Sequence, residues 1–252
     1  MSEIRKRSSD WKKVFKHLSD VQRYCSDYIA SWGSQAIPID RIWCDVLFMR
    51  SVVALKSVLI LIHNDAVDDA AIIVRTIFEI EFQLGAIKKD RQIAVRLIQG
   101  SELSRLKRLK SFADSGRALP EGITKEGITQ QLEEAKKTAS ELQKIFLAEQ
   151  ADLKNEYRTF YSALSDAAHV SPVGLRHYLE QGDAAGSYRI NSSGSLFSPE
   201  LVMALASATE LEILKIVKQI RGDAGDEKLE ALALENGQII DAVRQQAFQT
   251  GT

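Results

Sequence analysis

Cysteine and proline are scarce in this chain of 252 residues, which has two cysteines and four prolines. Cys25 and Cys44 lie on different expected helices and show no CxxC or Cys/His spacing, so the sequence predicts reduced thiols, with neither a disulfide framework nor a metal site. A shortage of proline favours long uninterrupted helices. The net charge is also small, at −1, and this excludes a global attraction to nucleic acid or anionic lipid.

The chain also lacks a long unbroken hydrophobic run. Its most apolar stretch, residues 46–62, is interrupted by Arg50 and Lys56, and the clean part is well short of the roughly 20 residues that a membrane-spanning helix needs. The N-terminal segment is charged and has no apolar core of the kind found in signal peptides. We therefore expect residues 46–62 to form a buried helix of a cytoplasmic protein that has no membrane anchor.

Apolar residues recur with the period of an α-helix along almost the whole chain, and no stretch alternates strictly enough to predict a sheet. We expect one all-α domain over residues 1–252, built as a bundle of about seven helices. The Gly/Ser-rich residues 181–198 are expected to form a loop or a small hairpin. The expected helical ranges are 10–32, 38–63, 67–89, 91–115, 129–149, 151–169, 199–220 and 227–248.

Two lines of polar residues interrupt otherwise apolar helices, and each falls within a narrow angular range at 3.6 residues per turn. The first line consists of Asp68, Arg75 and Glu79. The second consists of Arg158, Ser162, Ser165 and His169. One interpretation is structural, because a buried Arg and Glu need partners and an interior ion pair would fix helix packing. The other is a functional pocket in which arginine binds an anion, and serine and histidine bind phosphate or activate a hydroxyl group.

Positive charge is concentrated in residues 88–110, which contain eight Lys or Arg against two Asp or Glu. A solvated helix face explains such a pattern, and so does a track for RNA phosphates. The RNA-binding candidates are Arg105, Lys107, Arg108 and Lys110. Residues 223–241 are acidic by contrast, so the charge asymmetry is compatible with self-association into a homodimer.

Two short motifs resemble a known family. The segments IIVRTIFEIEFQL and YSALSDAAHVSP are similar to the signature sequences of domain of unknown function 5677, a mainly bacterial, all-helical family. The resemblance covers about residues 40–220 and implies a cytosolic helical protein without an established activity or cofactor. Carried over to this chain, it points to Arg75, Glu79, Ser165 and His169.

A more distant resemblance is to HEPN domains, helical bundles that often act as metal-independent ribonucleases in toxin and phage-defence systems. Those enzymes use a closely spaced Arg and His, whereas ten residues separate Arg158 from His169 here. Arg75, from another helix, would have to supply the cation. The sequence therefore leaves two hypotheses: a HEPN-like protein that binds or cleaves RNA in stress or phage defence through Arg75, Glu79, Arg158, Ser165 and His169, and a non-enzymatic interaction module whose polar lines only fix packing.

Overall fold

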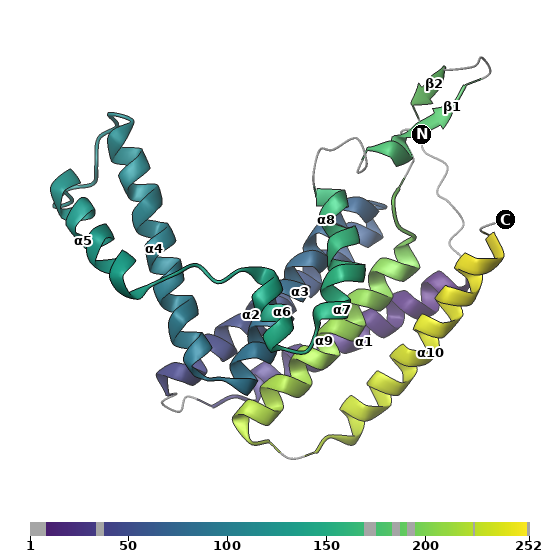
Figure 1. Cartoon of the computed structure of the whole chain (residues 1–252). Coiled ribbons are helices and arrows are strands. Elements are labelled where there is room, and N and C mark those ends of the chain that lie inside the picture. The colour runs from purple at the N-terminus through teal and green to yellow at the C-terminus, as the bar shows by residue number, and fades with distance from the viewer. Residues whose placement is uncertain are drawn as a thin grey trace.

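The computed structural model describes residues 9–33, 38–168, 175–182, 187–190, 195–223 and 225–250. Helices account for 79% of the chain, so the all-α prediction is confirmed. The body of the molecule is a bundle of long helices, and a pair of helices projects from it as an arm (Figure 1). The body helices are α1 (Ser9–Ala30), α2 (Ile39–His63), α3 (Val67–Lys89), α9 (Pro199–Arg221) and α10 (Glu227–Thr250).

The arm consists of α4 (Gln92–Asp114) and α5 (Lys125–Thr138) (Figure 1). The chain returns from the arm to the body through α6 (Lys144–Gln150). It then passes α3 as α7 (Lys154–Glu156), a π-helical turn (Tyr157–Tyr161) and α8 (Ser162–Ala168). The α6–α8 segment packs on α3, which lies at the centre of the body between α2 and α9.

Most of the long helices begin and end where the sequence predicts. The beginning of α9 shows why, because the Ser198 side chain accepts a hydrogen bond from the Leu201 backbone N–H and Pro199 occupies the first helical position. Gly222 ends this helix in the left-handed conformation, with φ 77°. These signals are local in sequence, so they can be recognised without knowledge of the tertiary structure.

Two expected helices are divided in the structure. The expected helix 129–149 is broken at residues 139–143, which cross α4 so closely that a Cβ on Gly100 would lie 3.0 Å from the Ser140 carbonyl oxygen. The expected helix 151–169 contains the π-helical turn, where the Ser162 hydroxyl donates to the Tyr157 carbonyl oxygen five residues earlier. Both departures depend on packing between segments that are far apart in the sequence.

The expected loop or hairpin at residues 181–198 is in part a hairpin. Strands β1 (Leu179–Gln181) and β2 (Tyr188–Ile190) pair antiparallel, with Glu180 opposite Arg189. Residues 183–186 and 191–194 of this segment lie outside the described residues. The hairpin stands at the end of the body, away from the arm (Figure 1).

Helix α2 is buried on one face only, whereas the sequence predicts a buried helix for residues 46–62. One face packs into the core, but the other exposes a line of large apolar side chains: Ile42, Val46, Met49, Val53 and Ile60. The reason is position, because α2 lies at the edge of the body and contacts neighbours on one side only. By length and composition Arg41–His63 is the single helix of the described residues that would reach across a bilayer, and 44% of its most apolar window is buried inside the protein.

A buried ion pair joins α2 to the end of α9. Arg221 Nη1 donates to both carboxylate oxygens of Asp45, at 3.0 and 2.9 Å, and Asp45 is only 4% exposed. The Arg221 guanidinium also lies 4.2 Å from the centre of the Trp32 ring at the end of α1. Three helices therefore meet at one charged pair, in which Asp45 is buried and the Arg221 side chain is 12% exposed.

Glu210, in the middle of α9, is completely buried and accepts a hydrogen bond of 2.9 Å from the Ser51 hydroxyl of α2. Burial raises the pKa of this carboxyl from 4.5 to about 8, and the hydrogen bond from Ser51 offsets only part of that shift. The group is therefore protonated at neutral pH. Its stabilising contribution is complete below pH 4.5 and is lost as the pH rises to about 8, because the unfolded chain ionises first.

Glu210→Gln is expected to raise the free energy of unfolding at pH 8 by on the order of 2 kcal/mol, because glutamine resembles the protonated acid and does not ionise. The gain should disappear near pH 5. Urea denaturation at the two pH values measures the difference. An exposed control, Glu133→Gln on α5, should show no such pH-dependent gain. Equal stability of wild type and Glu210→Gln at pH 8 would show that the buried carboxyl ionises without cost.

Candidate functional site

Arg75, Glu79 and Ser165 come together where α3 faces α8. The Arg75 Nε–H donates to the Ser165 hydroxyl oxygen at 2.9 Å, and Arg75 Nη2 lies 3.5 Å from Glu79 Oε1. Both charged side chains are 22% exposed. The two expected polar lines thus meet through Arg75 and Ser165, and their contact is open to solvent rather than sealed in the core.

Glu79 has two further partners. The Tyr161 hydroxyl donates to Glu79 Oε1 at 2.9 Å, and the Lys144 ammonium from the beginning of α6 forms an ion pair with the same oxygen. Partial burial lowers the pKa of Lys144, but hydrogen bonds to Glu79 and Tyr161 outweigh this effect, so that the pKa is raised overall. We call Arg75, Glu79, Lys144, Tyr161 and Ser165 the polar cluster. It contains two cations and one carboxylate.

The π-helical turn gives the cluster its aromatic wall. The Arg75 guanidinium lies 5.1 Å and the Lys144 ammonium 5.7 Å from the centre of the Tyr161 ring. Tyr157 stacks against Tyr161, with ring centres 4.9 Å apart. π-Helical turns occur frequently at functional sites, because the extra residue redirects side chains. Here the turn places Tyr161 against α3 and leaves the neighbouring Arg158 exposed.

Several residues of the two polar lines lie elsewhere. Asp68 does not reach Arg75, but accepts hydrogen bonds from the hydroxyls of Tyr178 and Ser195 and so fixes the segments beside the hairpin. Arg158 is exposed and contacts no member of the cluster within the described residues, and the Ser162 hydroxyl bonds to its own helix backbone. His169 lies outside the described residues, four positions after Ser165 in the sequence.

Lys144 is the member of the cluster that sequence reasoning missed. It belongs to a separate helix, and no spacing relates it to Glu79, 65 residues away. Tyr161 flanks the second polar line in the sequence, so its place was partly visible. A lysine that begins a short helix carries no comparable signal.

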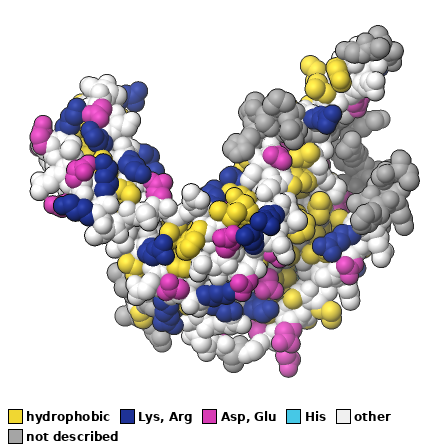
Figure 2. Space-filling view, in the orientation of Figure 1, with side chains coloured by type: hydrophobic (Ala, Val, Ile, Leu, Met, Phe, Trp, Pro, Cys, Tyr) yellow, Lys and Arg dark blue, Asp and Glu magenta, His cyan; other side chains and the backbone are white. Residues whose placement is uncertain are grey.

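The basic arm is largely paired with its own acids. Arg105 bonds to Glu102 at 2.7 Å, and Lys107 lies 2.8 Å from Glu141. Lys110 lies 3.1 Å from Asp114, whereas Arg108 has no ion pair within the described part of the chain. Hydrogen bonds from Arg105 and Lys107 lower the pKa values of Glu102 and Glu141, and those from Lys125 and then Lys110 lower the pKa of Asp114. Figure 2 accordingly shows both signs of charge intermixed on the arm.

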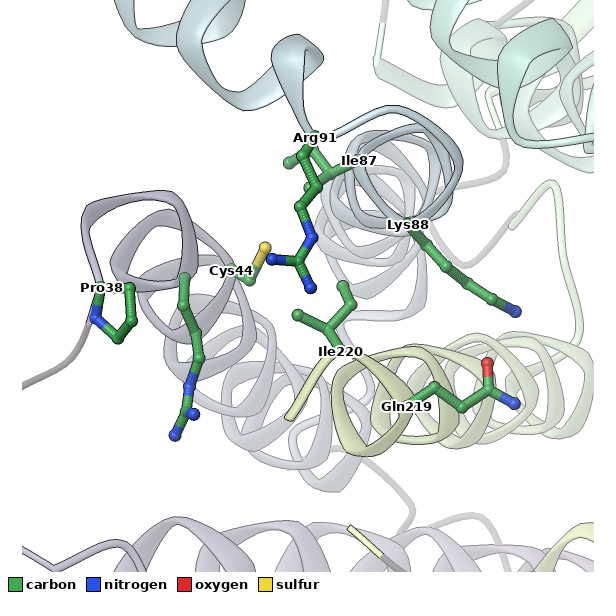
Figure 3. A pocket seen from close by; sticks show the side chains of 8 residues that line it. Pro38, Cys44, Ile87, Lys88, Arg91, Gln219 and Ile220 are labelled. Carbon is green, nitrogen blue, oxygen red and sulfur yellow. The ribbon is translucent and has the colours of Figure 1, made fainter. Parts of the chain in front are cut away.

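A hollow of about 340 Å³ lies between α2, the α3–α4 junction and the end of α9. It is lined by Arg41, Lys88 and Arg91 beside Cys44, and this suggests an anion site. The cations do not converge, however: the Lys88 side chain extends away from Arg91 (Figure 3). Arg41 is also 3.8 Å from the Asp45 carboxylate. The hollow therefore lacks the concentrated positive charge of the polar cluster.

Metal ligands do not cluster in the part of the chain that the structure describes. It contains no group of three or more His, Cys, Asp or Glu side chains that could hold a metal ion. Cys25 and Cys44 are both buried and are not joined in a disulfide. Burial is the main cause that raises the pKa of the Cys25 thiol, with a smaller effect of Glu210.

Comparison with known proteins places the sequence in a family. No curated protein and no solved structure matches the chain significantly. A profile described as a family of unknown function, DUF5677, matches residues 42–187. This range is more than half of the chain and includes α3, the arm and every member of the polar cluster. The chain therefore belongs to the DUF5677 family.

Proposed function

We propose that this protein is a HEPN-like ribonuclease of stress or phage defence, in which the polar cluster binds a phosphodiester of single-stranded RNA and His169 acts as the base. The observation that carries the proposal is the state of Arg75. Its Nε–H is held by Ser165 and one side of its guanidinium faces Glu79, while the side chain remains 22% exposed. The other N–H donors have no hydrogen-bond partner within the described residues, which suits an incoming phosphate oxygen.

The chemistry of the cluster supports the same substrate. Two cations share one carboxylate, so the site carries a net positive charge of +1 before substrate binds. The exposed Arg158 adds a further cation on the adjoining turn. In the proposed reaction, His169 accepts the proton of the ribose 2′-hydroxyl and the 2′-oxygen attacks phosphorus. The 5′-oxygen leaves and takes a proton from water, while Arg75 stabilises the charge on the phosphoryl oxygens.

RNA binding tests the first half of the proposal. Wild-type protein is expected to bind a fluorescent single-stranded RNA, and the affinity should fall steeply between about 50 and 200 mM salt. Arg75→Gln should weaken binding by roughly 10- to 150-fold, since a charge-assisted phosphate contact contributes about 1.5–3 kcal/mol. Arg23→Gln, on an exposed part of α1, is the matched control and should bind as wild type. No binding of wild-type protein at low salt would contradict the proposal.

The arm is assigned a second, weaker RNA contact. Most of the cations on the arm are already paired with acids. Replacing them should therefore reduce the salt dependence of RNA binding, but by less than if each cation contacted a phosphate of its own. The same fluorescence assay measures this slope. The residues to be changed together to glutamine are Arg105, Lys107, Arg108 and Lys110. An unchanged slope would assign them to a solvated helix face.

A non-enzymatic interaction module is the second candidate, and one observation favours it. Glu79 joins α3 to both α6 and the π-helical turn, so the cluster also stabilises the packing of these elements against one another. In that case Arg75→Gln and Glu79→Gln would lower the free energy of unfolding without any effect on RNA binding or cleavage. Cytoplasmic location and homodimer formation remain predictions from the sequence.

A further inference from the structure

A groove of about 410 Å³ lies beside the π-helical turn, and none of the residues that line it belongs to the polar cluster. It is formed by α3, residues 151–160, α9 and α10, and this volume is typical of a small-molecule site. Its walls are mainly apolar: Phe78, Phe160, Leu201, Leu205 and Ile216. Figure 2 shows apolar side chains gathered along this face, with charged side chains around them.

Gly85 allows one wall of the groove to lie close to α3. A Cβ on Gly85 of α3 would lie 2.7 Å from the Cβ of Ala151, so only glycine permits the α6–α7 connection to lie this close. The close approach brings Leu153 and Glu156 to the edge of the groove. The groove and the polar cluster share no residue: Tyr161 belongs to the polar cluster, and the neighbouring Phe160 lines the groove.

Glu81 lines the groove and is only 4% exposed. Its carboxyl group has no hydrogen bond or ion pair within the described residues, unlike Glu79 two positions earlier. A carboxyl that is this deeply buried and has no partner among these residues is costly to ionise, because water reaches it only through the groove. A ligand group that forms a hydrogen bond or an ion pair with the Glu81 carboxyl would therefore bind favourably, because the protein has already placed this unpaired group in the groove.

The surrounding charges determine which ligand group fits. Burial, and then the neighbouring acidic side chains Glu212, Glu156 and, once it ionises, Glu210, raise the pKa of Glu81 to about 8. Acids thus act on Glu81 from α7 and from α9. The cations of the lining lie toward the exposed edges: Lys89 is paired with Asp152, and Lys88 and Arg244 are exposed. A carboxylate ligand would meet repulsion at the buried end, whereas a cation would relieve it.

The acids do not converge on one point, as a metal ion would require. No group of three or more ligands for a metal is present in the residues that the structure describes, and Glu156 and Glu212 act on Glu81 without forming such a group. An extended ligand with an apolar body matches the groove better than a compact ion. We propose that this groove binds an amphipathic organic cation, with its ammonium group against Glu81 and its hydrocarbon part between Phe78 and Phe160.

Proton release follows from this assignment. The cation binds best to ionised Glu81, so binding at neutral pH releases one proton from that carboxyl to the solvent. The other titratable groups that face Glu81 are Glu156, Glu210 and Glu212, with Lys88, Lys89 and Arg244 at the edges. Of the acids, Glu210 has a similarly raised pKa, but it lies outside the groove and can be tested separately.

Calorimetric titration of the full-length protein with octylammonium chloride, octanol and sodium octanoate tests the proposal. Octylammonium should bind at least about tenfold more tightly than either analogue at pH 8.5, because only it pairs with the carboxylate. Its affinity should rise by up to about tenfold per pH unit below pH 8 and level off above. Titrations in two buffers that differ in ionisation enthalpy should detect up to one released proton at neutral pH.

Variants assign the effect to Glu81. Glu81→Gln should lose the octylammonium preference and the pH dependence but keep octanol binding, and Glu210→Gln should keep all three. Glu156→Gln, at the edge, should weaken octylammonium by a smaller factor and serves as a second test if Glu81→Gln does not fold. Equal affinity for octanol or octanoate, no octylammonium binding at millimolar concentration, or an unchanged preference in Glu81→Gln would overturn the proposal. None of these outcomes bears on RNA binding by the polar cluster.

Discussion

His169→Ala is expected to lower the rate of RNA cleavage by about 10²–10⁴-fold, the contribution typical of a general acid or base. Binding of RNA and the thermal melt should stay as in wild type, because the phosphate contact belongs to Arg75. The rate is measured as single-turnover cleavage of a labelled single-stranded RNA. Activity should persist in a chelator, since the proposed reaction uses the ribose 2′-hydroxyl and a protein base.

Two controls separate the histidine from a contaminating nuclease. An RNA in which all 2′-hydroxyls are replaced by hydrogen should bind but remain uncut. His63→Ala, at the exposed end of α2, should cut as wild type. If purified protein cuts no RNA, or if His169→Ala cuts as fast as wild type, the enzymatic assignment fails and the interaction module takes its place.

Asp45→Ala is expected to lower the free energy of unfolding by about 3–5 kcal/mol, because it leaves the largely buried Arg221 charge with only a 3.8 Å contact to Asp223. For a chain of this size the corresponding fall in Tm is roughly 6–20 °C. Arg221 is held by both oxygens of Asp45, and Asp45 is 4% exposed, so solvent cannot easily compensate. Urea denaturation and a thermal melt measure the two quantities.

The matched control for this pair is Asp20→Ala on α1. Asp20 contacts Lys16 and Arg23 at the surface, and the loss of such pairs changes stability by about 0–1 kcal/mol. Adding Arg221→Met to Asp45→Ala should recover part of the lost stability, since the stranded charge is then removed. A melt of Asp45→Ala within a degree or two of wild type would show that Arg221 finds water or another partner.

The sequence was sufficient for the parts of the fold that local signals determine. Helix α3 begins and ends at the expected residues, and α9 begins at the expected proline, because caps and apolar periodicity act within a few residues. The apolar surroundings of Arg75 and Glu79 predict that they bond to each other or to the helix that carries Ser165, and Arg75 contacts both Glu79 and Ser165.

Long-range packing explains what the sequence did not reveal. The π-helical turn has no marker in YRTFY, and Lys144 reaches Glu79 only because the chain turns back from the arm. Glu81 belongs to neither polar line of the sequence, yet it is more deeply buried than Glu79. Two residues along a helix change its direction by about 200°, so neighbouring glutamates meet different environments, one solvent-facing and one in the groove.

The arm has a small apolar cluster of its own, formed by Leu103, Leu106 and Leu132, which is separate from the main core. Helix α4 belongs to both, since Ile93 and Ala94 at its beginning are part of the main core. Such a small cluster resists local opening far less than the body does, so amide hydrogen exchange and proteolytic nicking should concentrate in the arm. We therefore expect local opening in the arm while the body remains folded, so the arm is the part of the described structure whose shape should respond most to a bound partner.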